Sequence, residues 1–191
     1  AKGLRLRKSA PVPLPATSDA PARSWYRGSD GAIARDLSAA AIAAAVSAGQ
    51  GLLWVDLPVG SAATPKLLRD VFRFHPLSIE DTQSAEGRVK VEEFPSYLLV
   101  VVRAVRFIEE TEDLYDIETF NLWVFVGKNF VVTVHGTHAP AVEATELLLS
   151  RSGDLMDRGP GWLMHQVLDA TVDAYFPVVT RLDEFVDGLE E

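Results

Sequence analysis

The sequence predicts an α/β fold in which a mixed, largely antiparallel sheet carries helices on both faces. Strand-like segments rich in apolar, β-branched and aromatic residues follow one another over residues 90–135, with turn residues between them. A separate apolar strand at 52–57 precedes this run, and helical spacing of apolar residues returns after residue 140. Helices before and after the strands would cover opposite faces of the sheet, which gives an α/β/α sandwich that ends in the start of a long helix.

The chain is expected to consist of a disordered tail over residues 1–24 and one domain over residues 25–191. Closely spaced prolines in the tail remove backbone donors and oppose helix formation. Short strands at 25–27 and 32–34 flank an Asp-Gly turn, which predicts a hairpin at the start of the domain. The length of 191 residues and the hydrophobic content of 48% are sufficient for one buried core.

Capping residues mark the helices of the first half. Ser38 is placed to accept a backbone N–H at the start of an alanine-rich helix over 39–48, which a following glycine can end. Thr64 before a proline predicts the cap of a second helix, beyond the strand at 52–57. His75 also precedes a proline and predicts the start of a third, short helix.

The second half of the domain changes from strands to helices. Four consecutive strands predict an antiparallel meander over 90–94, 97–107, 117–126 and 130–135. A helix is expected over 140–149 and another from Trp162 onward. Pro177 should kink this last helix or break it at Phe176, because proline lacks the N–H of the helical ladder.

The composition restricts the classes of partner. The net charge of −9 opposes binding to nucleic acid or to anionic lipid and favours cations. The sequence contains no cysteine, so disulfides and thiolate metal sites are excluded. No apolar stretch approaches the roughly eighteen residues that a membrane-spanning helix needs. The sequence starts without methionine and ends in mid-pattern, so we expect it to be a piece of a longer protein.

Three ordered motifs carry a resemblance to a known family. They are HPLSIED at residues 75–81 with RVKVE at 88–92, GKNFVVT at 127–133, and LDATVDAYFP at 168–177. Together they resemble the cytoplasmic domain of the CorA-type magnesium and cobalt transporters, from about residue 52 to the end. The family usually has proline where this chain has Val89, so the loop before it is expected to bend differently.

Two pairs of carboxylates are candidate metal ligands. Glu80 and Asp81 are adjacent on a helix, where neighbouring side chains point about 100° apart, so they cannot chelate one ion alone. Asp169 and Asp173 are four residues apart and share one helix face. From the residues alone, the first pair is compatible with ordinary surface acids. For Asp173, a salt bridge to a basic side chain and a metal role both remain open.

The resemblance implies a regulatory role for these acids. In the family, divalent ions lie between the cytoplasmic domains of neighbouring subunits, and matching the motifs assigns Glu80, Asp81 and Asp169 as ligands, with a further acid on a stalk helix outside this chain. The implied protein is a homopentamer in the cell (inner) membrane, with this domain in the cytoplasm. Weakly bound Mg²⁺ would favour a closed pore, and Co²⁺ or Zn²⁺ are further candidate ions. The chain would then not be an enzyme.

Three alternatives to this interpretation stay open. The zinc-transporting branch of the same superfamily shares the fold. A soluble metal-dependent hydrolase could use Glu80, Asp81 and Asp169, although no nucleophile or general-base motif accompanies them. A free-standing metal sensor is the third. His135 and His138 are interpreted as structural residues, because their spacing does not show the convergence that a zinc site needs.

Overall fold

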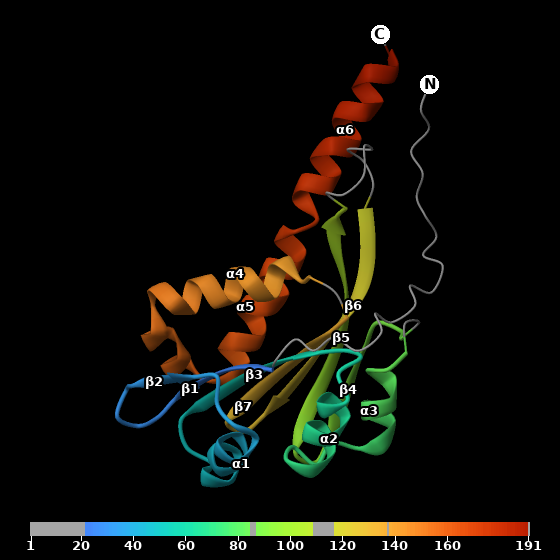
Figure 1. The fold of residues 1–191 in the computed structure, drawn as a ribbon. Helices are drawn as coiled ribbons and strands as arrows, with labels where there is room; N and C mark the ends of the chain where they lie inside the picture. The colour runs from blue at the N-terminus through green and yellow to red at the C-terminus, as the bar shows by residue number, and fades with distance from the viewer. Residues whose placement is uncertain (1–21, 85–86, 109–116, 137, 191) are drawn as a thin grey trace.

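The computed structural model describes residues 22–84, 87–108, 117–136 and 138–190, and it confirms the predicted α/β class. A seven-stranded sheet forms its centre, with strand order β2-β1-β3-β7-β6-β5-β4 (Figure 1). The strands are β1 (Arg23–Arg27), β2 (Ile33–Arg35), β3 (Leu52–Pro58), β4 (Lys90–Phe94), β5 (Tyr97–Phe107), β6 (Ile117–Gly127) and β7 (Phe130–His135). Residues 1–21, most of the predicted tail, lie outside the described residues.

Within the described residues, β3 and β7 are the parallel pair of this sheet, and the other neighbouring strands are antiparallel. The run from β4 to β7 is the predicted meander. Strands β1 and β2 form the predicted hairpin, and β1 starts at Arg23, two residues earlier than expected. The sheet is therefore mixed and largely antiparallel, as the sequence indicates.

Helices cover both faces of the sheet (Figure 1). They are α1 (Ala39–Ala48), α2 (Ala63–Asp70), α3 (Pro76–Asp81), α4 (Pro140–Arg151), α5 (Pro160–Asp173) and α6 (Phe176–Glu190), with a 3-10 helix at Gly153–Arg158. Strand β3 is buried on both faces, and its alternate residues pack into two separate hydrophobic cores on opposite sides of the sheet. Leu53 and Val55 pack with Ile42 of α1 and Ile79 of α3, whereas Trp54 packs on the face of α4 and α5.

Of the predicted caps of α1 and α2, the structure confirms the first and contradicts the second. Ser38 caps α1 as predicted, because its hydroxyl accepts the N–H of Ala41 at 3.3 Å, and Gly49 ends the helix with φ of 64°. Thr64 does not cap α2. It lies buried inside the helix and donates its hydroxyl to the carbonyl of Pro58 at 2.8 Å. The Thr64 side chain therefore anchors α2 to the end of β3 and does not cap the first turn of the helix.

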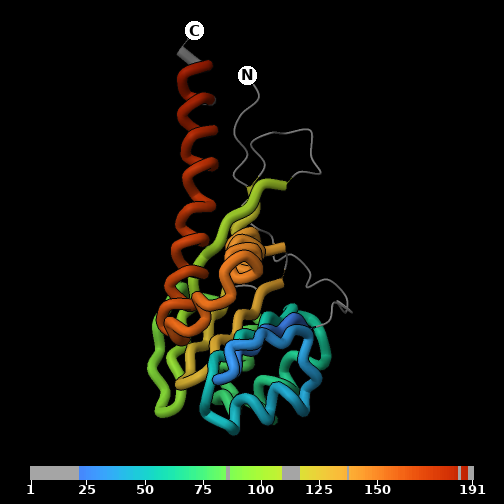
Figure 2. The backbone as a smooth tube through the Cα atoms, turned by 90° about the vertical axis from the view of Figure 1, so that its left-hand side faces the viewer, coloured from blue at the N-terminus to red at the C-terminus, as the bar shows by residue number. Residues whose placement is uncertain are grey.

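The predicted break near Phe176 separates α5 from α6, with Pro177 in the first turn of α6. Figure 2 shows α6 rising beside β5 and β6 and continuing beyond them. Its base is held to β5, because Tyr175 donates to the carbonyl of Arg103 at 2.7 Å and the Arg181 guanidinium lies 3.9 Å from the Phe107 ring centroid. Among the residues described, no helix is long and apolar enough to cross a membrane.

Candidate metal-binding site

Helix α3 holds the first pair of predicted ligands, and Tyr97 of β5 fixes its position. The N–H of His75 donates to the Tyr97 hydroxyl at 3.0 Å, and the hydroxyls of Ser78 and Tyr97 are 2.9 Å apart. His75 caps the helix, because its ring nitrogen accepts the N–H of Leu77 at 3.3 Å. This contact confirms that His75 is a helix-start residue. Ile79 anchors the helix in the core, so the carboxylates that follow stand on a rigid support.

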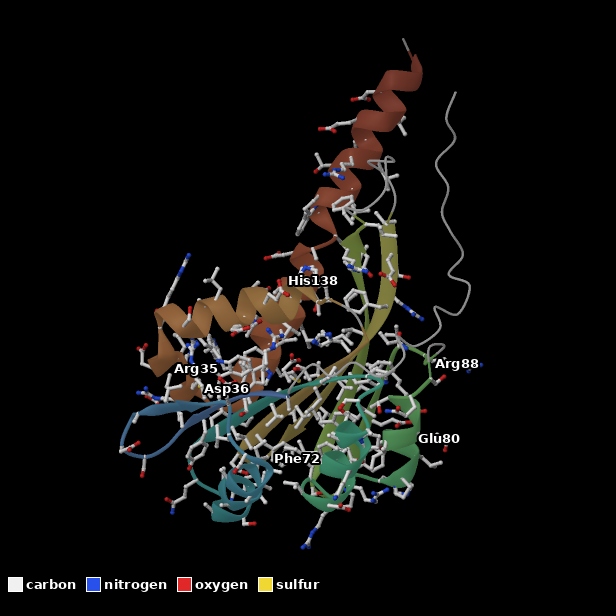
Figure 3. All side chains as sticks on the ribbon, viewed as in Figure 1. Arg35, Asp36, Phe72, Glu80, Arg88 and His138 are labelled. Atoms are coloured by element: carbon white, nitrogen blue, oxygen red, sulfur yellow. The ribbon has the colours of Figure 1, made fainter. Side chains whose placement is uncertain are left out.

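The two carboxylates of α3 have different surroundings. Glu80 is exposed and points outward from the helix (Figure 3). The Asp81 side chain is 36% exposed and its Oδ2 is in contact with the ammonium of Lys90 on β4. The same ammonium lies 3.0 Å from Oε2 of Glu92, two residues further along the strand. Asp81 therefore belongs to a local group of two carboxylates and one ammonium.

The loop between α3 and β4 is fixed at its far end. The amide of Asn121, on β6, donates to the carbonyl of Gly87 at 2.9 Å. A Cβ on Gly87 would lie 2.6 Å from that amide nitrogen, so glycine allows the close approach of the two chain segments. Val89, at the position where the resembled motif usually has proline, is 62% exposed.

The second pair of predicted ligands lies on the other side of the sheet. Asp169 and Asp173 are both exposed on α5, which packs on the sheet through Leu163 and Val167. Because α3 packs on the opposite face, the structure does not bring this pair together with Asp81. In the part of the chain that the structure describes, no three His, Asp or Glu side chains are grouped so as to hold a metal ion.

The residues present fit a hard divalent ion only in part. Carboxylate oxygens are the ligands that Mg²⁺ prefers, and Mg²⁺ normally keeps several of its waters. Each surface offers one or two carboxylates, so an ion there would have to complete its shell with water or with groups from another chain.

A buried polar cluster around Asp56 is the feature that the sequence prediction missed. Asp56 of β3 is 4% exposed and accepts hydrogen bonds from Arg23 at 2.8 Å and from the Thr133 hydroxyl at 2.6 Å. His135 Nε2 lies 3.0 Å from the same carboxylate. Arg23 also contacts Glu146 of α4 at 2.8 Å. The cluster joins β1, β3, β7 and α4.

The missed cluster had one signal in the sequence. Asp56 interrupts an otherwise apolar strand, and a buried carboxylate needs partners to offset the loss of hydration. Burial acts to raise the pKa of Asp56, but the hydrogen bonds from His135, Thr133 and Arg23 hold that pKa below its ordinary value. The residue is therefore a charged structural anchor in the fold.

The histidine contacts support a structural role for His135 and His138. His135 faces Asp56, whereas His138 Nδ1 lies 2.6 Å from Glu143 at the start of α4. The two rings contact different carboxylates, so the structure does not gather them into the shared ligand set that a zinc site requires.

Comparison with known proteins supports the resemblance found in the motifs. Residues 49–191 match the family model described as CorA-like Mg²⁺ transporter protein. The chain is 34% identical over 138 residues to the putative metal ion transporter YfjQ of Bacillus subtilis, covering 72% of this chain and 41% of that protein. It is 26% identical over 123 residues to the cobalt/magnesium transport protein CorA of Thermotoga maritima, covering 64% of this chain and 34% of that protein. The chain thus spans less than half the length of these relatives.

Solved structures show the same fold. The soluble domain of CorA from Methanocaldococcus jannaschii superposes with a TM-score of 0.65 at 19% identity, covering 87% of this chain and 62% of that one. The ZntB cytoplasmic domain of Vibrio parahaemolyticus gives 0.63 at 9% identity, covering 87% of this chain and 63% of that one. The matched family is one of transport proteins, which agrees with the prediction that the chain is not an enzyme. The motifs, the family match and the shared fold lead to one conclusion: the chain belongs to the family of CorA-like Mg²⁺ transporter proteins.

Proposed function

We propose that this chain is the cytoplasmic regulatory domain of a membrane protein that transports divalent metal ions. Mg²⁺ bound weakly by Glu80, Asp81 and Asp169 at subunit interfaces would control the pore. The observation that carries the proposal is the placement of these carboxylates at the surface of rigid helices, in sets too small to complete an ion's shell. The predicted tail, which must end before β1 begins at Arg23, would precede this domain, and the stalk and membrane segments would follow it.

The proposed assembly is a homopentamer in the cell (inner) membrane. Acids on opposite faces of one sheet can meet across a boundary between neighbouring subunits even though they cannot meet within one subunit. An ion between two such surfaces favours the arrangement in which they are close, and loss of the ion leaves like charges to repel each other. A change in cytosolic Mg²⁺ would then shift the population between a closed and an open pore.

The donor set favours Mg²⁺ as the regulatory ion over Zn²⁺. Carboxylate and water ligands suit hard ions, whereas zinc sites use imidazole or thiolate groups. Next to the acids of α3, His75 already accepts a hydrogen bond at the start of the helix. On α5, His165 is a single imidazole four residues before Asp169, and the chain contains no cysteine. Co²⁺ remains a candidate cargo, because the Thermotoga relative is named a cobalt/magnesium transport protein. Asp173 is proposed as an auxiliary ligand on the same helix face as Asp169.

The test is Asp81→Asn in the full-length protein. The substitution keeps the shape of the side chain and replaces a charged ligand with a neutral amide, which binds Mg²⁺ less strongly. We expect the closing response to cytosolic Mg²⁺ to move about fivefold higher in concentration, which corresponds to about 1 kcal/mol of lost binding. The measurement is ion uptake as a function of internal Mg²⁺.

The matched control is Asp70→Asn, because Asp70 is an exposed acid on α2 whose contact is with the adjacent Arg69. This control removes the same charge and should leave the midpoint unchanged. Ion selectivity should be unaffected in both variants, since the pore lies outside this domain. An unchanged midpoint in Asp81→Asn would reduce Asp81 to an ordinary surface acid.

A further inference from the structure

Lys90 places its ammonium against Asp81, one of the proposed metal ligands. Its Nζ is in contact with Oδ2 of Asp81 and lies 3.0 Å from Oε2 of Glu92. Lys90 and Glu92 are two residues apart on β4, so their side chains share one face of the strand. That face is the side of α3, because the partners of Lys90 and Glu92 on β5 are Val101 and Leu99, which pack in the same core as Ile79.

The ammonium is charged and able to move. The hydrogen bond that Lys90 donates to Asp81 raises the pKa of Lys90, so the side chain stays positive at physiological pH. Its side chain is 29% exposed, against 36% for Asp81 and 43% for Glu92. A lysine carries a compact charge on a flexible stem, so it can leave one carboxylate for solvent without disturbing the backbone. The geometry is therefore that of a displaceable counter-ion.

We propose that Lys90 is a tethered competitor that sets the affinity of Asp81 for divalent ions. This inference rests on the proposed function, in which Asp81 is a regulatory ligand. When no ion is present, the ammonium neutralises Asp81 and lowers its repulsion toward acids on a neighbouring subunit. When Mg²⁺ binds, it must displace the ammonium from Asp81, and Glu92 then keeps the released charge nearby. Binding is weakened by the free energy of the displaced ion pair.

The test is a set of Lys90 variants in the full-length protein, with metal binding measured directly. Mn²⁺ takes the same oxygen ligands as Mg²⁺, and its free form can be followed by electron paramagnetic resonance while Mg²⁺ competes. Lys90→Met removes the charge and keeps the apolar stem. We expect its Mg²⁺ half-saturation to fall about two- to fivefold, the range for losing a partly exposed ion pair. Lys90→Arg keeps the charge and should stay close to wild type.

The matched control is Lys128→Met, which removes the same charge from an exposed lysine in the turn between β6 and β7. Equal shifts in Lys90→Met and Lys128→Met would show a general effect of net charge and overturn the proposal. Weaker binding in Lys90→Met would also overturn it, since Lys90 would then support the site. Lys90→Gln serves as a second neutral variant should the methionine variant fail to fold.

A double variant separates this inference from the proposed function. Adding Lys90→Met to Asp81→Asn should cause no further change, because the carboxylate for which the two cations compete is gone. If Asp81→Asn alone weakens Mg²⁺ binding while Lys90→Met has no effect, the proposal that Lys90 competes for Asp81 is wrong and the proposed function stands. If Asp81→Asn has no effect on binding, the assignment of Asp81 as a regulatory ligand fails.

Discussion

Arg23 and Asp56 form an ion pair of 2.8 Å that joins β1 to the centre of the sheet. The Asp56 side chain is only 5% exposed, so solvent screens this pair much less than a surface pair. The same arginine reaches Glu146 on α4 at 2.8 Å. One side chain therefore connects the start of the domain to both the sheet and a covering helix.

Replacing Asp56 with Asn should destabilise the fold. The substitution removes the buried charge that Arg23, Thr133 and His135 contact, but Arg23 is 35% exposed and keeps Glu146, so the cost should be lower than for a fully buried pair broken from one side. We expect a loss of about 1–3 kcal/mol in the free energy of unfolding, measured by denaturant titration. The exposed Asp70→Asn change should stay within about 0.5 kcal/mol. A loss below about 1 kcal/mol for Asp56→Asn would contradict the anchoring role.

The same carboxylate predicts how stability depends on pH. The pKa of Asp56 is lower in the folded state than its ordinary value of about 3.9, so its contribution is fully present above that value. The contribution should fall as the pH drops below about 4, toward the folded pKa. Acid titration of the unfolding free energy should therefore show a steeper acid limb for the wild type than for Asp56→Asn. Parallel curves would indicate that other groups control acid unfolding.

Gly127→Ala should be destabilising because of crowding at the β6–β7 turn. An added Cβ would lie 2.2 Å from the ring of Phe130, and that ring packs edge-on against Phe72 at 5.0 Å. We expect a loss of about 1–3 kcal/mol in thermal or chemical denaturation. Gly161→Ala is the matched control, since nothing lies within 4 Å of its added Cβ and the helix should gain up to about 1 kcal/mol. A neutral Gly127→Ala would mean that the ring relocates freely.

The isolated chain should bind Mg²⁺ only weakly. The structure brings together no three carboxylate or histidine donors among its described residues, so the missing ligands must be water or come from another chain. Calorimetric titration should give a shallow curve that is hard to saturate at millimolar Mg²⁺. A tight stoichiometric site on this chain would point to a complete site within one domain, and would revive the hydrolase interpretation.

Local rules predicted most of the fold. The alternation of apolar residues, the serine cap at Ser38 and the proline at the α5–α6 break each act over a few residues, so the sequence displays them directly. The prediction that Thr64 caps α2 was wrong, because its hydroxyl donates to the carbonyl of Pro58, a contact that competes with capping. The family motifs named the carboxylates of the candidate site, and spacing alone did not distinguish them from surface acids.

The contacts that the sequence could not predict are those between distant segments. His135 reaches Asp56 across 79 positions, because the parallel register of β3 and β7 places both at one end of the sheet. Lys90 is only nine positions from Asp81, yet their contact depends on how the intervening loop turns. The register between two strands and the path of a loop cannot be predicted from the periodicity of apolar residues. That periodicity indicates only which face of a strand or helix a residue occupies.

The parallel pairing of β3 with β7 has a consequence for how the chain folds. Strands β4 to β7 pair between neighbours in the sequence, so this group can assemble early with little loss of loop entropy. Strand β1 pairs with the next strand, β2, and also with β3, from which β2 and α1 separate it. The two groups of strands, β1 to β3 and β4 to β7, are joined where Leu53 pairs with Phe130, across 77 positions. The pairing of β3 with β7 should therefore be the slow step of folding. During synthesis it must wait until β7 has left the ribosome, and until then the edge of β3 is open to pairing with another chain.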